Sequence, residues 1–164
     1  MTVQRTEPGA GQESVWDYPR PPRLEPCTKP IQIVYAGLTI VDTVRALRVL
    51  ETSHPPVYYV PREDVRIAHL RPAAGRSYCE RKGEAEYFDV IGGTRTAPRA
   101  AWSYPDPTPA FAPIRGHLAF YAAAMDACTV DGEPVTPQPG GFYSGWITAN
   151  VVGPFKGAPG SAGW

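Results

Sequence analysis

The sequence lacks the paired cysteines and the long apolar runs that would assign a small protein to a class at once. Its three cysteines, Cys27, Cys79 and Cys128, lie far apart, and no Cys-x-x-Cys pair occurs. Neither a zinc knuckle nor a thioredoxin-like redox site is therefore expected, and we predict no metal and no cofactor. No run approaches the roughly 18 consecutive apolar residues of a spanning helix, so no membrane partner is expected.

The sequence has no excess of positive or negative charge, because its 16 lysines and arginines equal its 16 aspartates and glutamates in number. A chain without net charge has no long-range field that would draw it to a phosphate backbone, so no nucleic-acid partner is expected. The first eight residues contain no apolar core of signal-peptide type. A cytoplasmic location is therefore the expectation.

The motifs that mark common enzymes are absent as well. The sequence contains no Gly-x-x-x-x-Gly-Lys-Ser/Thr, no Gly-x-Ser-x-Gly, no His-Glu-x-x-His and no Gly-x-Gly-x-x-Gly. Nucleotidyl transfer commonly requires clustered metal-binding carboxylates, and no Asp-x-Asp pair occurs. No reaction can therefore be assigned from a motif.

What is present is a chain of 164 residues, 43% of them hydrophobic, which suits one domain with one core. Its 20 prolines argue against long helices, because each interior proline removes a hydrogen-bond donor and costs about 3 kcal/mol. Together with the recurring short apolar segments described below, this predicts an all-β fold with mainly antiparallel strands and at most a short helix or turn.

The chain divides into four segments by composition. Residues 1–14 are polar and are predicted to be a disordered tail. Residues 15–29 alternate rings with prolines, which indicates an extended aromatic arm that docks on the body, or else a flexible tail. Residues 30–136 form the predicted domain. Residues 137–164 hold seven of the 16 glycines together with several aromatic rings, which indicates a strap laid over the domain.

Short apolar segments with turn residues between them recur about every ten residues, as in an antiparallel sandwich or barrel. Strands are predicted at 31–36, 38–42, 57–60, 77–80, 84–91, 100–104, 117–122 and 125–130. Residues 44–51 fit either a helix or a bent strand, and residues 62–70 fit a short helix or a turn.

Two charged residues stand out as candidates for chemistry. Glu51 lies between Leu50 and a Thr-Ser-His-Pro-Pro run, where partial burial would raise the pKa of its carboxyl group and suit it to acid–base work. The plain alternative is a partner for an arginine or a turn amide. Lys82 precedes Gly83 and could bind an anion, form an imine or pair with Glu51; the alternative is an exposed hairpin lysine.

Aromatic residues supply the candidate walls of a binding site. Trp102 and Tyr104 share a face if 100–104 is a strand, because side chains two residues apart point the same way. With Tyr59, Tyr87 or Tyr121 they could stack on a planar ligand, although such pairs also occur simply as core. The three histidines are not at ligand spacing, and His54 suits a turn. Cys79 is expected to be a buried structural thiol.

Several of these segments together resemble the bacterial family called domain of unknown function four-two-seven. They are Arg45-Ala46-Leu47-Arg48-Val49-Leu50-Glu51, Tyr58-Tyr59-Val60-Pro61-Arg62-Glu63-Asp64-Val65, Cys79-Glu80-Arg81-Lys82-Gly83-Glu84-Ala85, Ala101-Trp102-Ser103-Tyr104 and Phe120-Tyr121. The resemblance covers about residues 15–135, and the strap is similar to that of actinobacterial members. The family also carries a nucleotidyltransferase-like label, whose required motifs are absent here.

The resemblance implies a β-tent-like fold, with two small antiparallel sheets meeting at an angle, related to methionine-sulfoxide reductase B and to the drug-binding domain of cereblon. Several relatives hold zinc through paired Cys-x-x-Cys motifs, from which this chain departs. What the resemblance leaves is an aromatic cleft between the sheets, which in cereblon-type relatives takes a planar cyclic ligand.

These observations predict an enzyme, or an enzyme-like binder, of a small planar polar metabolite. Glu51 would act as the acid or base, Lys82 would contact an anionic or carbonyl group, and Tyr59 would be the third catalytic residue. The ligand would be bound by Trp102, Tyr104, Tyr87 and Tyr121. A non-catalytic binding module and a protein-interaction domain that uses the aromatic arms are the alternatives. A homodimer is expected if the arm or strap docks on a second copy.

Overall fold

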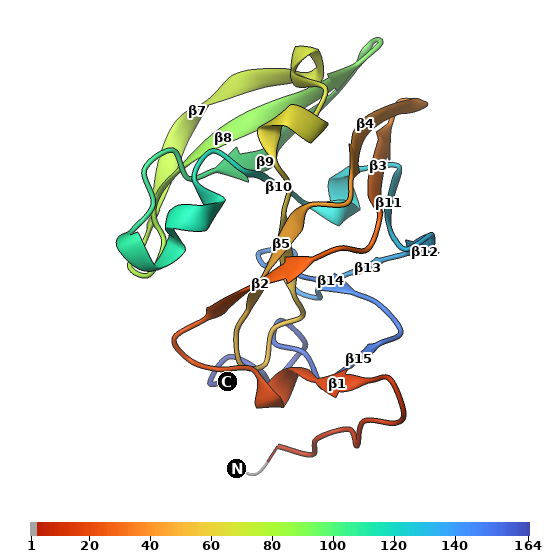
Figure 1. Ribbon diagram of the computed structural model, residues 1–164, viewed down its shortest axis with the longest axis vertical. Coiled ribbons are helices and arrows are strands. Elements are labelled where there is room, and N and C mark those ends of the chain that lie inside the picture. Colours follow the sequence, from red (N-terminus) through yellow and green to blue (C-terminus); the bar gives the residue numbers. More distant parts are fainter. Residues whose placement is uncertain (1–2) are drawn as a thin grey trace.

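Strands form most of the regular structure in the computed structural model, which describes residues 3–164 (Figure 1). Helical structure within these residues is limited to five short 3-10 helices: η1 (Val15–Asp17), η2 (Arg62–Asp64), η3 (Ile67–His69), η4 (Pro109–Ile114) and η5 (Ala122–Ala124). The predicted all-β, mainly antiparallel fold is confirmed.

Three antiparallel sheets make up the body. The first, in the order β10-β9-β8-β7, consists of Leu118–Phe120, Arg95–Ser103, Gly83–Gly92 and Leu70–Cys79. The second, in the order β12-β11-β3-β4, consists of Glu133–Pro134, Ala127–Val130, Ile31–Tyr35 and Leu38–Thr43. The third, in the order β2-β5-β6, consists of Arg23–Cys27, Ala46–Leu50 and Val57–Tyr59. Two-stranded pairs join β1 (Glu13–Ser14) to β15 (Val151–Val152) and β13 (Thr136–Pro137) to β14 (Trp146–Ile147).

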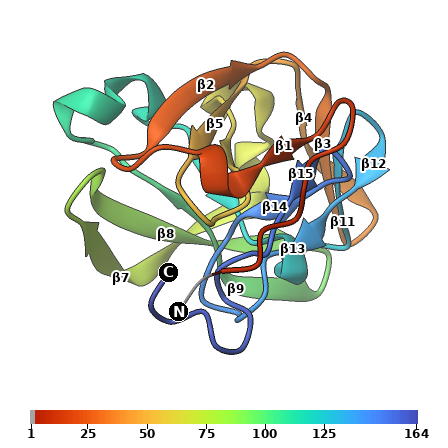
Figure 2. The ribbon, with the colours of Figure 1, turned by 90° about the horizontal axis from the view of Figure 1, so that it is seen from below.

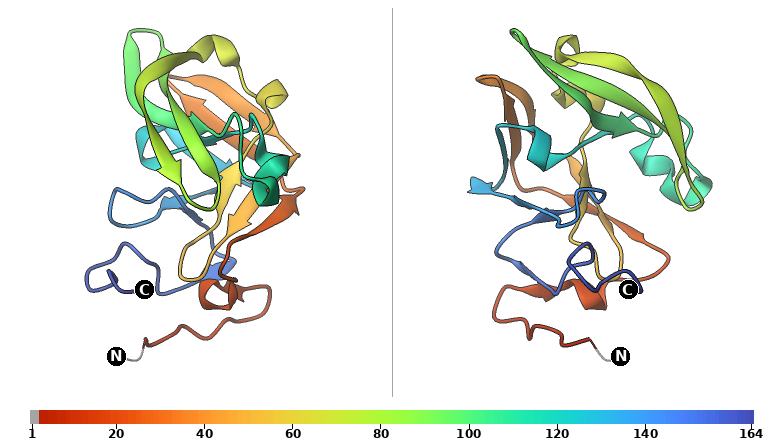
Figure 3. Two further views of the ribbon diagram at one scale, coloured as in Figure 1. Left: turned by 90° about the vertical axis from the view of Figure 1, so that its left-hand side faces the viewer. Right: turned by 180° about the vertical axis from the view of Figure 1, so that it is seen from behind.

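The number of sheets differs from the two that were expected, because the arm strand β2 pairs with β5 and so builds a sheet around it. This third sheet is connected to the first by one bridge, in which the backbones of Val60 and Leu118 exchange hydrogen bonds of 2.8 and 2.9 Å. Figure 3 shows the first sheet lying at an angle to the second.

The predicted hairpin of residues 31–42 is present as β3 and β4. Its turn residues Ala36 and Gly37 have φ values of 52° and 76°. Positive φ at both central positions is the requirement of a two-residue type I′ turn, and its twist matches the twist of the flanking strands. The turn therefore fixes the pairing of Tyr35 with Leu38.

Within the ambiguous residues 44–51 the chain forms a strand, β5 (Ala46–Leu50), rather than a helix. This strand pairs with β2 on one side and with β6 on the other, so it is central in its sheet and largely buried. Its Arg48 is only 8% exposed and donates to Glu13 at 2.7 Å and Glu25 at 2.6 Å. A buried guanidinium requires such partners, and they come from two other segments of the chain.

Strand β7 begins at Leu70 and is longer than the predicted 77–80 because it continues through Pro72 and Gly75. Proline cannot donate to a neighbouring strand, and β7 tolerates it as the edge strand of its sheet. The pairing with β8 shifts between Pro72 and Arg76, as expected for an irregular edge. Residues 62–70, which were predicted to form a short helix or a turn, contain the two short helices η2 and η3.

The largest core cluster joins the second sheet to the first. It includes Ile31, Ile33 and Ile40 on one side and Val90, Ala101, Leu118 and Phe120 on the other, all at most 1% exposed. A second cluster surrounds Tyr59 and contains Trp102, Tyr104, Phe111 and Ile114. This second cluster forms one side of the cavity described below.

The arm and the strap both pack on the body of the same chain. Val15, Leu50 and Val151 form a third apolar cluster with Tyr18. The Trp16 indole donates to the Pro154 carbonyl at 2.9 Å. Figure 2 shows the first and last segments of the chain together on one side of the molecule.

Part of the tail that was predicted to be disordered makes hydrogen bonds to the strap. The Thr6 amide donates to the Gly153 carbonyl at 2.9 Å, and strand β1 runs parallel to β15. These contacts are between backbones, which explains why a composition-based argument did not anticipate them. Met1 and Thr2, which belong to the same prediction, lie outside the described residues.

Candidate functional site

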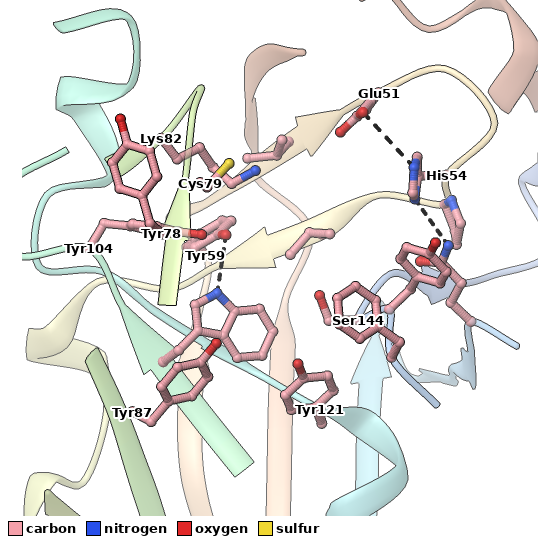
Figure 4. Close-up of a pocket in the computed structure, with 17 residues that line it drawn as sticks. Glu51, His54, Tyr59, Tyr78, Cys79, Lys82, Tyr87, Tyr104, Tyr121 and Ser144 are labelled. Atoms are coloured by element: carbon pink, nitrogen blue, oxygen red, sulfur yellow. Dashed lines mark hydrogen bonds and ion pairs between the residues drawn. The ribbon is translucent and has the colours of Figure 1, made fainter. Parts of the chain in front are cut away.

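A cavity of about 340 Å³ lies where the ends of β5 and β6, the strands of the first sheet and the strap meet (Figure 4). Its walls contain six tyrosines, one tryptophan and one phenylalanine, together with one carboxylate, one ammonium, one imidazole and one thiol. The lining residues are Val49, Glu51, His54, Pro55, Val57, Tyr59, Tyr78, Cys79, Lys82, Tyr87, Trp102, Tyr104, Tyr121, Gln138, Phe142, Tyr143 and Ser144.

All seven predicted site residues line this one cavity, although they come from six segments of the chain. Glu51 follows β5, Tyr59 is on β6, Lys82 is in the turn between β7 and β8, Tyr87 is on β8, Trp102 and Tyr104 are at the end of β9, and Tyr121 follows β10. Sheet register explains part of the convergence, since Tyr87 and Trp102 are direct partners across β8 and β9.

Tyr59 and Trp102 form the deepest wall. Tyr59 is 1% exposed, and the Trp102 indole N–H donates to its hydroxyl oxygen at 3.3 Å. The ring of Tyr104 lies 6.3 Å from that of Tyr59. Burial raises the pKa of Tyr59 well above its usual range, and the neighbouring Tyr104 raises it further. Burial likewise raises the pKa of Tyr104. Both hydroxyls are therefore neutral hydrogen-bonding groups at physiological pH.

Tyr121 and Tyr87 lie beside Trp102 and continue the wall that the first sheet forms. The ring of Tyr121 lies 4.7 Å from that of Trp102, and burial raises the pKa of its hydroxyl. The Tyr87 hydroxyl shares a 2.7 Å hydrogen bond with Ser77, and the Arg99 guanidinium lies 4.0 Å from the centre of its ring. These contacts fix the orientation of both rings before any ligand arrives.

Glu51 is partly exposed and interacts with two neighbours. Its Oε2 lies 3.8 Å from Nε of Arg20 and 4.0 Å from Nε2 of His54, and its side chain is 29% exposed. The arginine partner that was the plain alternative is thus present. Because Arg20 belongs to the arm, docking of the arm contributes to the electrostatic environment of Glu51.

A strained turn places Glu51 and His54 side by side. The intervening Ser53 has a φ of 72°, in the left-handed region that serine rarely adopts, and its buried hydroxyl has no hydrogen-bond partner among the described residues. The turn is closed by the His54 amide, which donates to the Glu51 carbonyl at 3.0 Å. Such strain at a cavity wall is common in functional sites.

Lys82 brings positive charge to the cavity. Its ammonium lies 5.8 Å from the centre of the Phe111 ring, and no carboxylate of residues 3–164 lies within 4.0 Å of it. The next strand begins at Gly83, whose φ is 113° and where an added Cβ would lie 3.2 Å from the Asp106 carbonyl oxygen. An ammonium without an acidic partner can interact with an anionic or carbonyl group of a ligand.

Sequence reasoning missed the contribution of the strap. Gln138, Tyr143 and Ser144 close one side of the cavity, and no motif connects them to residues some 60 positions earlier. The rings of His54 and Tyr143 lie 5.3 Å apart and almost perpendicular. His54 was expected only as a turn residue and is both a turn residue and part of the cavity.

Cys79 and Tyr78 also differ from expectation. Cys79 was expected to be a buried structural thiol but is only half-buried and faces the cavity, because it ends an edge strand. Tyr78 is 74% exposed, and Phe142 of the strap is 78% exposed. Both aromatic rings belong to the cavity lining, one from β7 and one from the strap, so the cavity opens between exposed apolar groups.

The imidazole of His54 has a lowered pKa. Burial is the main cause, the positive charges of Lys156, Arg20 and Lys82 lower it further, and only Glu51 acts in the opposite direction. His54 is therefore neutral at physiological pH. Among residues 3–164, no three His, Cys, Asp or Glu side chains gather as metal ligands would. The same residues include no helix with the length and apolar character needed to cross a membrane.

The family model described as Domain of unknown function (DUF427) matches residues 23–131, well over half of the chain. The chain therefore belongs to this family, as the resemblance of its sequence segments predicted. No curated protein matches the chain. The matched region includes all seven predicted site residues but not the strap residues of the cavity.

Proposed function

We propose that the cavity binds, and acts on, a small planar polar metabolite. The observation that carries the proposal is the convergence of Glu51 and Lys82 with five aromatic side chains on one cavity of about 340 Å³. A cavity of that size with few, well-placed polar groups is typical of small-molecule sites. The exposed rings of Tyr78 and Phe142 would extend contact to a part of the ligand that reaches the mouth.

In this proposal the aromatic walls recognise the flat face of the ligand. Trp102 and Tyr121 would stack on it, and the neutral hydroxyls of Tyr59 and Tyr104 would hydrogen-bond to its polar edge. Lys82 would contact an anionic or carbonyl group, for which it has no competing carboxylate within 4.0 Å in the described chain. The raised pKa of Tyr59 makes it a hydrogen-bonding group rather than a proton carrier.

Glu51 would supply acid–base chemistry. It is the carboxylate of the cavity lining, it retains partial solvent access, and it lies within 4.0 Å of the His54 imidazole. A positioned carboxylate that accepts or returns a proton in the transition state contributes roughly 100- to 10,000-fold to a rate.

Turnover by matched carboxylate variants tests the proposal. Wild type, Glu51→Gln and the exposed control Glu63→Gln would each be incubated with a small-molecule extract of the producing cells. We expect one compound to be consumed by wild type and by Glu63→Gln and to persist with Glu51→Gln, which still retains it on the protein. If Glu51→Gln consumes the compound as fast as wild type does, Glu51 has no acid–base role. If wild type neither consumes nor binds any compound of the extract, the proposal is overturned.

A second candidate is a non-catalytic binding module that uses the same cavity. The ion pair between Glu51 and Arg20, at 3.8 Å, favours this candidate, because it gives the carboxylate a structural role that requires no catalysis. In that case the extract experiment gives retention of a compound by wild type without consumption. The absence of nucleic-acid and membrane partners, a cytoplasmic location and a possible homodimer remain predictions.

A further inference from the structure

Gln138 of the strap forms a hydrogen-bond arrangement that determines where His54 carries its proton. The Gln138 side chain is 4% exposed. Its Oε1 accepts from the Gly145 amide at 3.0 Å, and its Nε2 donates to the Lys156 carbonyl at 2.9 Å. An amide N–H can only donate and a carbonyl can only accept, so these two backbone partners assign the orientation of the side-chain amide.

This orientation leaves one role for the imidazole. The Gln138 Nε2 lies 3.1 Å from Nδ1 of His54, and because Nε2 is a donor, Nδ1 must be the acceptor (Figure 4). A neutral imidazole has one donor and one acceptor nitrogen, so the proton of His54 resides on Nε2. Protonation of both nitrogens would place the Nδ1–H against the N–H groups of Gln138, where it has no acceptor.

The proton on Nε2 is directed to the cavity side of the ring. Nε2 lies 4.0 Å from Oε2 of Glu51, which is longer than a hydrogen bond, and it makes no hydrogen bond to the described residues. A ligand hydroxyl about 2.8 Å from both atoms would satisfy them together, accepting from Nε2–H and donating to Glu51. The other groups that act on this imidazole are Tyr143, Lys156, Arg20 and Lys82.

We propose that His54 is a ligand-contacting residue of this cavity, which presents a neutral Nε2–H donor to a ligand hydroxyl beside Glu51, and that Gln138 is the positioning residue that fixes this tautomer. The ligand contact rests on the proposed function, whereas the tautomer does not. The proposal also explains a buried glutamine in an otherwise irregular strap, since its amide connects the strap to the turn that carries Glu51.

Nitrogen-15 spectroscopy of the three imidazoles tests the tautomer. The other histidines are internal references, because Nδ1 of His69 lies 3.0 Å from the Ile91 carbonyl and must carry a proton there. We expect His54 to be the Nε2–H tautomer at pH 7 and Nδ1 of His69 to carry a proton. An Nδ1–H tautomer or a doubly protonated ring for His54 at pH 7 would overturn the proposal.

Gln138→Glu supplies the discriminating variant, because a carboxylate at this position would accept a hydrogen bond from Nδ1. The variant should convert His54 to the Nδ1–H or the doubly protonated form, while Gln32→Glu, with the same charge change at an exposed position of β3, should leave it unchanged. An unchanged His54 in folded Gln138→Glu would remove Gln138 as the positioning residue. If that variant does not fold, the wild-type spectrum still decides the tautomer.

Native mass spectrometry of His54→Phe decides the ligand contact. We expect this variant to lose at least tenfold in retention of any hydroxyl-bearing compound that co-purifies with wild type, while His117→Phe keeps it. Equal retention by His54→Phe would overturn the contact. If wild type has the expected tautomer but binds nothing from the extract, the proposed function fails and the Gln138–His54 geometry stands.

Discussion

Trp146 anchors the strap, and its replacement by alanine should destabilise the whole domain. The indole is 2% exposed, its ring lies 5.1 Å from that of Tyr58, and its N–H donates to the Phe120 carbonyl at 3.2 Å. Truncation of a buried tryptophan costs about 3–5 kcal/mol through lost burial and the cavity left behind. For a chain of this length each kcal/mol corresponds to about 2–4 °C, so Trp146→Ala should lower the melting temperature by about 6–20 °C.

Two further variants separate packing from hydrogen bonding. Trp146→Phe keeps most of the ring but leaves the Phe120 carbonyl without its donor, which should cost about 1–3 kcal/mol. Phe142→Ala is the matched control, because that strap ring is 78% exposed and should change stability by less than about 0.5 kcal/mol. Thermal unfolding followed by circular dichroism measures all three. A loss below about 1 kcal/mol for Trp146→Ala would refute the account of the strap as part of the fold.

The other expectations concern buried charge and thiol reactivity. Burial opposes ionisation of Glu13, but hydrogen bonds from Arg48 and Tyr18 outweigh it and leave its pKa below the ordinary value of 4.5. The pairing with Arg48 therefore stabilises the fold fully above about pH 4.5 and is lost as the pH falls through the lowered pKa. In urea titrations the stability lost by Arg48→Met should be largest at pH 7 and should shrink as the pH falls through that lowered pKa. A loss that does not change with pH would contradict the pairing. Burial raises the pKa of the Cys128 thiol to about 12, so at pH 8 roughly one molecule in 10,000 carries its thiolate. Only one thiol of the native protein, Cys79, should react quickly with a disulfide reagent, and Cys79→Ser should abolish this fast phase of the reaction. A fast phase that remains after the substitution would show that the accessible thiol is not the one in the cavity.

The sequence was sufficient to predict the fold class because its signals are local. Alternating apolar residues at 31–42 and 84–91, turn glycines and abundant proline each favour short strands without reference to the rest of the chain. Residues 44–51 stayed ambiguous for the same reason, since only pairing with β2 and β6 on both sides decides that they are a strand.

The convergence of the site could be predicted only in part. Residue types suited to a ligand site identified Glu51, Lys82 and the rings, and all seven line one cavity. The contacts of Gln138 with His54 join residues 84 positions apart through an irregular strap, and no periodicity encodes them. The unexpected exposure of Cys79 has a similar cause, because the edge position of β7 follows from the order of strands in its sheet.

Native mass spectrometry of the purified chain is the most direct test of the central claim that the cavity holds a small polar ligand. The account predicts a mass above that of the polypeptide that is lost on denaturation and identified as a planar compound with an anionic or carbonyl group. Lys82→Ala should lose at least tenfold in its retention, and Lys29→Ala, which changes an exposed lysine outside the cavity, should retain it. Retention that is equal in Lys82→Ala and wild type, or a compound of unrelated chemistry bound at another surface, would contradict the account.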